Sequence, residues 1–150
     1  MKKLYKLAIL ACVLGIFMLV LTGCTKTKSY TFKVETGDNV EIKMNVTGGY
    51  DLTSELPIKF SKDDEVLSQG IFAKEEYYDQ YYDSIINDSR AKIIEEKSTD
   101  DIDYVFYQYD DDEFNYIIKI KKSNTCFILG NNVSRESAQD IFKKLEFKLK

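Results

Sequence analysis

The side chains best suited to covalent chemistry in this 150-residue chain are three cysteines, Cys12, Cys24 and Cys126. A nucleophilic cysteine needs a nearby base, and the chain contains no histidine to serve as that base. Cys126 lies in the apolar run 125–129, where a thiol usually behaves as a small buried hydrophobe. The lack of histidine also excludes a Ser-His-Asp triad and a His-bound zinc site. The sequence therefore predicts a structural role for Cys126.

Cys24 has a different setting, because it closes the stretch "LTGC" at the end of an apolar segment. Three lysines in the first six residues precede the uncharged segment 7–23, which is the layout of a secretory signal peptide. The stretch resembles the lipobox of bacterial lipoproteins, in which Leu, a small residue and Gly or Ala precede an obligatory Cys. The resemblance implies a diacylglyceryl group on the Cys24 thiol, acyl chains such as palmitate in the membrane, and cleavage between Gly23 and Cys24.

Three segments follow from this interpretation: a signal peptide over 1–23, the lipidated Cys24 with a short tether over 24–29, and a single domain over 30–150. Two acyl chains give durable attachment to the extracytoplasmic face of the cell membrane. Two alternatives are a retained transmembrane anchor, since the apolar segment is slightly short of a span, and an ordinary secretory signal with a chance cysteine.

Charge limits the possible partners of the mature chain. Removal of residues 1–23, which hold three lysines and no acidic residue, leaves 127 residues with 18 basic and 25 acidic side chains and a net charge of −7. Nucleic acid is excluded as a partner because phosphates require clustered Lys and Arg. Broad adhesion to anionic lipid is disfavoured for the same reason, so the lipid on Cys24 is expected to be the membrane contact.

Two further patterns could support catalysis or metal binding. The spacing from Ser89 to Lys92 matches Ser-x-x-Lys, the nucleophile pattern of penicillin-binding proteins, but the partner motifs are missing and the serine falls at a helix end. The acidic run 110–113 offers hard oxygens for calcium, yet it lacks EF-hand spacing and reads better as a solvated hairpin turn. We expect no metal and no cofactor, and paired carboxylates acting on a glycosidic bond are a minor alternative.

Tyrosine is the most unusual feature, with 11 in the chain. Tyr buries a large ring while its hydroxyl stays wet, which suits interfaces with proteins or sugars. The segment 102–109 is apolar on both faces, and one face needs a cover. We expect either a binding patch built on Tyr107 and Tyr109 with Tyr77 or Tyr81, or burial of that face under the C-terminal helix. A core that simply uses Tyr in place of Leu or Phe is the plain alternative.

Hydrophobic periodicity predicts the elements that position these residues. Alternation predicts strands, an i, i+1, i+4, i+5 stripe predicts a helix over 74–87, and Ser134 is the expected N-cap of a second helix over about 134–145. Residues 50–64 are expected to be irregular. The predicted strands are 30–35, 40–46, 65–73, 91–97, 102–109, 114–121 and 125–130, with a possible short strand at 147–149.

Because strands come in runs, the fold class is α+β, with a mostly antiparallel sheet of about six to eight strands packed with two helices. The element order, with the late helix "SAQDIFKKLEF", resembles the PsbP-like fold of extrinsic photosystem subunits and of many small bacterial lipoproteins. NTF-like and cystatin-like domains are alternatives. The sequence predicts a non-catalytic binding or assembly module of the cell envelope, with an envelope protein or glycan as partner; a cell-envelope hydrolase is the alternative.

Overall fold

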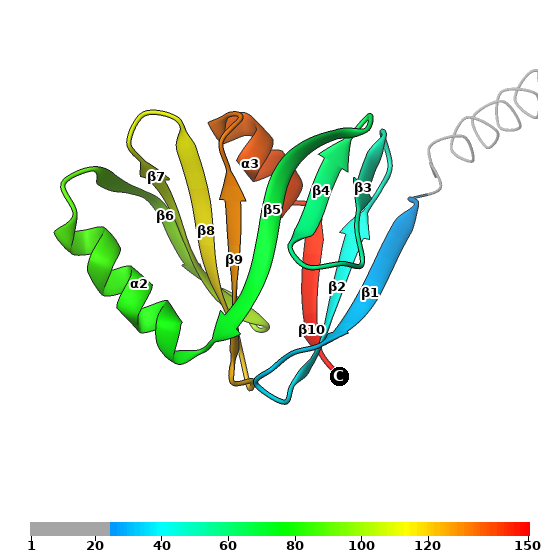
Figure 1. Ribbon diagram of the computed structural model, residues 1–150, viewed down its shortest axis with the longest axis horizontal. Coiled ribbons are helices and arrows are strands. Elements are labelled where there is room, and N and C mark those ends of the chain that lie inside the picture. The colour runs from blue at the N-terminus through cyan, green and yellow to red at the C-terminus, as the bar shows by residue number, and fades with distance from the viewer. Residues whose placement is uncertain (1–24) are drawn as a thin grey trace, which may run out of the picture.

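The computed structural model describes residues 25–150, which form ten strands and two helices (Figure 1). The expected α+β class with antiparallel pairing and two helices is confirmed. In chain order the elements are β1 (Thr27–Lys33), β2 (Asn39–Asn45), β3 (Tyr50–Leu52), β4 (Ile58–Lys62), β5 (Glu65–Lys74), α2 (Glu76–Asn87), β6 (Ala91–Ser98), β7 (Ile102–Tyr109), β8 (Glu113–Ile120), β9 (Thr125–Asn131), α3 (Arg135–Phe142) and β10 (Leu145–Leu149).

Seven strands form one sheet in the order β3-β4-β5-β9-β8-β7-β6, and every neighbouring pair is antiparallel. The meander β6 to β9 matches the four β-branched and aromatic segments of the sequence. Its turns use left-handed residues, Asp110 after β7 and Lys122 after β8. The turn between β4 and β5 likewise has Asp63 and Asp64 at positive φ. Asp tolerates this conformation better than most residues, which explains its use at these three positions.

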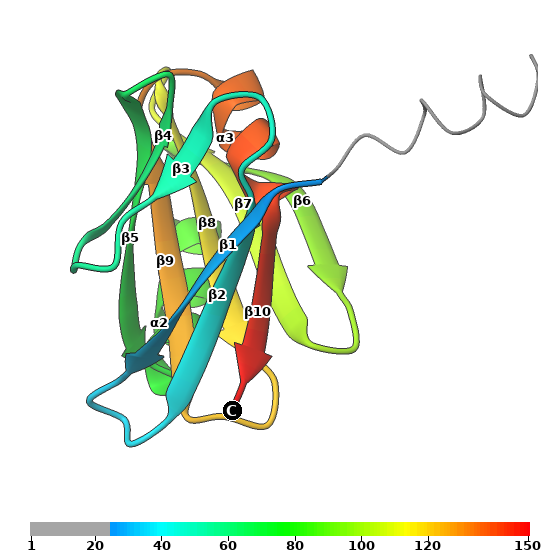
Figure 2. The same cartoon turned by 90° about the vertical axis from the view of Figure 1, so that its right-hand side faces the viewer.

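A second sheet of three strands, β1-β2-β10, packs against one face of the large sheet (Figure 2). Its Ile42 and Met44 are fully buried, and Phe147 on β10 contacts Phe127 on β9 with 5.4 Å between ring centroids. The possible strand at the C-terminus is thus real, and it pairs with β2 roughly one hundred residues away in the chain. The side chains between the two sheets form the main core of the protein.

The two helices cover opposite faces of the large sheet (Figure 1). Helix α3 begins as predicted, with the Ser134 hydroxyl accepting a hydrogen bond from the N–H of Ser137 at 3.0 Å. It packs on the inner face, beside the small sheet, where the ring of Phe142 stacks on Tyr116 at 4.1 Å. Helix α2 packs on the outer face through Ile85. The alternative that the C-terminal helix covers the face of Tyr107 is therefore wrong, because α2 covers it.

Three regions differ from the predicted ones. Helix α3 ends at Phe142 rather than near residue 145, because Leu145 already begins β10 and pairs with Met44 of β2. Residues 50–64 were expected to be irregular, but they hold β3 and β4, with Ile58 and Phe60 fully buried. Strand β1 begins at Thr27, inside the predicted tether 24–29. The predicted lipidation of Cys24 and the signal peptide 1–23 lie outside the described residues. Within residues 25–150, neither helix has the length and apolar character needed to cross a membrane.

Candidate functional site

The four tyrosines of the predicted patch do not share one exposed surface. Tyr107 is only 8% exposed beneath α2, and burial raises its pKa to about 12. Tyr109 is partly covered: the Arg90 guanidinium lies 4.6 Å from its ring centroid, and its hydroxyl donates to the Asp88 carboxylate at 3.3 Å. Tyr77 and Tyr81 on α2 are exposed, at 41% and 40%. Of the four, Tyr77 and Tyr81 thus offer exposed aromatic rings to a partner.

Tyr77 borders an apolar cleft of about 460 Å³. Leu56 and Ile71, two of the most exposed large apolar side chains of the described residues, line the same cleft. The half-buried ring of Phe72 connects the cleft to the main core, where it packs on Phe127 at 5.0 Å. The remaining lining residues come from the end of β1 and the turn after it, and from the end of β5: Lys33, Val34, Glu35, Thr36, Ala73 and Lys74.

The cleft exists because β4 does not extend alongside the last residues of β5. Strand β4 starts at Ile58, directly after Pro57, the only proline of the chain. Proline has no N–H to give to a ladder and is typical of the first position of a strand. On the β4 side, pairing of β5 therefore ends at Gly70, whereas on the β9 side it continues to Lys74. Residues 71–74 are left as an open edge beside the cleft.

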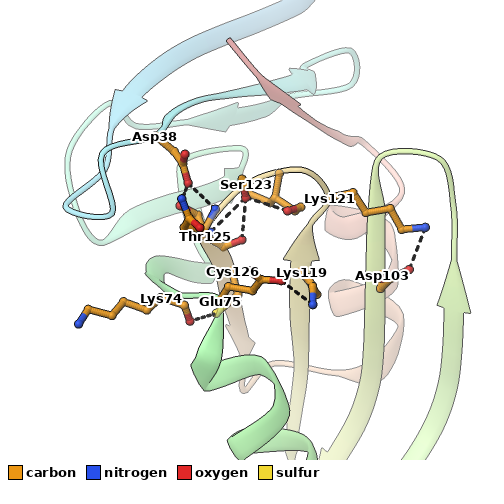
Figure 3. Close-up of polar contacts among 11 residues, drawn as sticks. Asp38, Lys74, Glu75, Asp103, Lys119, Lys121, Ser123, Thr125 and Cys126 are labelled. Atoms are coloured by element: carbon orange, nitrogen blue, oxygen red, sulfur yellow. Dashed lines mark hydrogen bonds and ion pairs between the residues drawn. The ribbon is translucent and has the colours of Figure 1, made fainter.

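A polar network fixes the opposite wall of the cleft (Figure 3). The Asp38 carboxylate, in the turn between β1 and β2, accepts from the Asn124 N–H at 2.8 Å and from the Thr125 hydroxyl at 2.7 Å. The hydroxyls of Thr36 and Thr125 are 2.5 Å apart. These bonds tie the small sheet to the β8–β9 turn of the large sheet. The wall is thus held by partly buried, well-partnered groups, which suits a preformed binding site.

Charges around the cleft are of both signs. Glu75 forms an ion pair with Lys119 at 2.5 Å, just below the cleft at the beginning of α2. In contrast, no carboxylate within residues 25–150 forms an ion pair with Lys33 or Lys74. The Lys74 side chain points away from the network in Figure 3. With Glu35, these two lysines give the lining a net charge of +1.

Cys126 and Ser89 have no arrangement that would activate them. Cys126 is fully buried, its thiol donates to the carbonyl of Lys74 at 3.2 Å, and burial raises its pKa to about 11. The thiol is therefore protonated near neutral pH and is a poor nucleophile. Ser89 is exposed in the turn after α2, and no hydrogen bond joins it to Lys92 in the described part of the chain. Neither side chain lines the cleft.

The acidic run 110–113 forms the exposed β7–β8 turn and the first residue of β8. The side-chain amide of Gln108 donates to the backbone carbonyls of Asp110 and Asp111 at 3.0 and 3.1 Å, which stabilises the turn through its main chain. No group of three or more Asp, Glu, Cys or His side chains in residues 25–150 is placed to hold a metal ion.

Sequence reasoning found Tyr77 but missed Leu56 and Ile71. A signal was present: Leu56 is a large apolar residue in a polar turn, immediately before Pro57 and the alternating run Ile58-Lys59-Phe60. Comparison of the chain with protein-family models, with curated proteins and with solved structures found no match.

Proposed function

We propose that this protein is a lipid-anchored, extracytoplasmic and non-catalytic module that binds a partner of the cell envelope through the cleft. The observation that carries the proposal is the gathering of exposed apolar side chains, Leu56, Ile71 and Tyr77, around one open strand edge. Exposed apolar side chains that gather in one place, with polar residues around them, are typical of an interaction site.

The position of the cleft relative to the anchor supports this role. Cys24 precedes the first residue of β1 by three positions, which can span at most about 10 Å. Strand β1 then runs seven residues, about 23 Å, toward the turn that contributes Val34 and Thr36 to the cleft. The first residue of β1, three positions after Cys24, and the turn that lines the cleft are thus at opposite ends of this strand (Figure 2). A lipid on Cys24 would present the cleft away from the membrane.

The absence of an activated nucleophile among the described residues supports a non-catalytic role. Purified protein incubated with envelope polymers and with generic ester or peptide substrates should show no saturable turnover. Turnover that is lost on Ser89→Ala or on substitution of one acidic residue would favour the hydrolase alternative.

Mass spectrometry of the membrane fraction tests the anchor. The expected product starts at Cys24 and carries the mass of a diacylglyceryl group. Cys24→Ala should block processing and leave the precursor in the membrane through residues 7–23. A soluble secreted product, or an intact Met1 in the wild-type protein, would contradict the anchor.

Site-specific photo-crosslinking in cells tests the binding role. A photoreactive amino acid at position 56 should give a discrete crosslinked product. The same group at position 133 is a matched control, because Val133 is 50% exposed against 61% for Leu56 but lies before α3, away from the cleft. Equal products from both positions, or none from position 56, would argue against the cleft as a binding site.

A further inference from the structure

We infer that the partner enters the cleft as an extended polypeptide segment that adds to the open edge of β5 as an extra strand. This inference rests on the binding role proposed above and names the chemistry of its partner. Strand addition is a general mode of recognition in which main-chain hydrogen bonds supply affinity and pockets for alternate side chains supply specificity.

Hydrogen bonding within the sheet shows which backbone groups of β5 face the cleft. The Lys59 N–H donates to the Thr53 hydroxyl at 2.9 Å, and the Lys59 carbonyl accepts from the Thr53 N–H at 3.0 Å, so both groups point away from β5. Its neighbour Ile58 therefore points toward β5, where it opposes Gly70. Backbone directions alternate along a strand, so two residues further the N–H and carbonyl of Phe72 point to the same, now empty, side.

The other end of the open edge gives the same assignment. The Glu75 N–H donates to the carbonyl of Asn124 at 2.8 Å, which continues the β9 side of the sheet. Odd-numbered residues 71–75 thus face β9, while the N–H and carbonyl of Phe72 and the N–H of Lys74 face the cleft. The Lys74 carbonyl already accepts from the Cys126 thiol at 3.2 Å. By this alternation Phe72 makes no ladder bond to β9, and none of the turn, loop or side-chain hydrogen bonds of residues 25–150 involves its N–H or carbonyl. An extended backbone is the ligand class whose donors and acceptors match this edge.

Apolar side chains stand on both sides of the edge. Side chains of an added strand would alternate between the two faces of the sheet. On the inner side they would meet Val34 and Phe72, and on the outer side Ile71 and Tyr77. A cleft of about 460 Å³ has room for a few such side chains. Lys33 and Lys74 further favour a segment with a carboxylate next to its apolar positions.

The open edge combines features that limit strand addition with an accessible apolar surface. Proteins guard open edges with proline, lysine, bulges and short length, and Pro57 and Lys74 flank this one. Here Pro57 and the beginning of α2 limit the opening to four residues, while Ile71, at 47% exposure, stays accessible beside it. A short opening restricts the occupant to a short extended segment and disfavours open-ended stacking of strands.

A displayed library of random seven-residue peptides, selected on the full chain purified in detergent, provides the probe. Selected sequences should alternate apolar and polar residues and include a carboxylate. A synthetic peptide of the selected sequence should slow hydrogen exchange of the Phe72 and Lys74 amides by about tenfold or more. Two forms of this peptide, N-methylated at its odd or at its even residues, keep every side chain. Only the form whose methyl groups replace the N–H donors that face β5 should lose binding.

Two variants of β5 separate the edge from the rest of the strand. Ile71→Asp should weaken binding of the selected peptide by about tenfold or more, since it places a charge beside the added strand. Val66→Asp is the matched control, because Val66 is 43% exposed on the same strand but opposes Ser61 of β4. It should leave the affinity within about twofold.

Four results of these binding experiments would overturn the inference. The first is a library that yields no enriched peptide, and the second is a selected peptide whose N-methylated forms all bind equally well. The third is equal affinity of the Ile71→Asp and Val66→Asp variants. The fourth is concentration-dependent dimerisation of the full chain that Ile71→Asp removes, since the occupant would then be a second copy. A crosslink from position 56 to a glycan or a folded partner would preserve the proposed function while this inference failed.

Discussion

The two faces of the seven-stranded sheet are covered to different extents. The inner face meets the small sheet and α3, and its Phe60, Phe106 and Phe127 are fully buried. Among residues 25–150, the outer face meets α2 alone, in which Ile85 is the one buried residue. Ile71 at the margin of this face is 47% exposed.

Simple dimensions explain the difference. Seven strands at a spacing of about 4.8 Å span about 29 Å, whereas one helix with its side chains is about 10–12 Å wide. Helix α2 lies over β6 to β9, where its neighbours include Val105, Tyr107 and Ile117. No element of the described residues 25–150 therefore covers the β4–β5 margin on the outer side. The inner face supplies stability, and the uncovered margin is where recognition can occur at little cost to the fold.

The largest expected effect is on the inner face. Phe127→Ala should lower the free energy of unfolding by about 3–5 kcal/mol, because it leaves a cavity among Phe60, Phe72 and Phe147. Urea denaturation of the purified chain measures the change. Phe127→Leu retains most of the volume and should cost less than half as much. A loss below about 1 kcal/mol for the alanine variant would contradict the view that the inner face supplies most of the stability.

A smaller effect is expected under α2. Ile85→Ala should cost about 2–3 kcal/mol, since Ile85 is 6% exposed and packs on one side of a single helix. The same urea titration measures it. Ile86→Ala is the control. Ile86, the next residue on the helix, is 54% exposed, so its replacement should change the free energy of unfolding by about 0.5 kcal/mol or less. A cost for Ile85→Ala equal to that of Phe127→Ala would mean that the outer face is as important as the inner one.

Alkaline pH should weaken the outer face through Cys126, which shares that face with Ile128 on β9. Burial raises the pKa of its thiol from an ordinary value near 9 to about 11. A group that holds its proton more tightly when folded stabilises the protein below its unfolded pKa, and this stabilisation is lost as pH rises toward the folded pKa. The free energy of unfolding should thus fall by about 1–2 kcal/mol between pH 9 and 11.

The alanine variant at this position isolates the contribution of the thiol. Cys126→Ala should keep the fold and show a shallower fall of stability across the same pH interval. Urea titrations at several pH values between 8 and 11 provide the comparison. An identical pH dependence in the two proteins would assign the fall to other groups, such as Tyr104 and Tyr107, whose pKa values burial raises to about 12.

The smallest effect on stability is expected at the uncovered margin. Ile71→Asp should change the free energy of unfolding by about 0.5 kcal/mol or less, because the side chain is already half in water. Thermal and urea unfolding of this variant beside the Val66→Asp control check it. A loss above about 2 kcal/mol would show that the margin belongs to the core and would weaken the assignment of a binding role.

The amino-acid sequence by itself determined most of the local structure. Alternating apolar residues define β1, β2 and β5 to β9, and the broad stripe of Tyr and Ile defines α2. The Ser134 cap defines the start of α3. These features follow from interactions between residues close in the chain, and binary pattern reports them directly. Strands β3 and β4 were missed, because they are short and surrounded by turn residues, although Ile58 and Phe60 already alternate with Lys59.

Only the tertiary structure decided which helix covers which face, and what is left uncovered. Periodicity shows that both faces of β7 are apolar, but it does not say whether α2 or α3 meets Tyr107. Division of the strands into two sheets depends on the pairing of β2 with β10, which no local pattern encodes. The cleft arises where the ladder on β5 ends at Gly70 on one side and at Lys74 on the other. Such a mismatch is a property of long-range register, set by packing of the whole core, and a single segment of sequence carries no record of it.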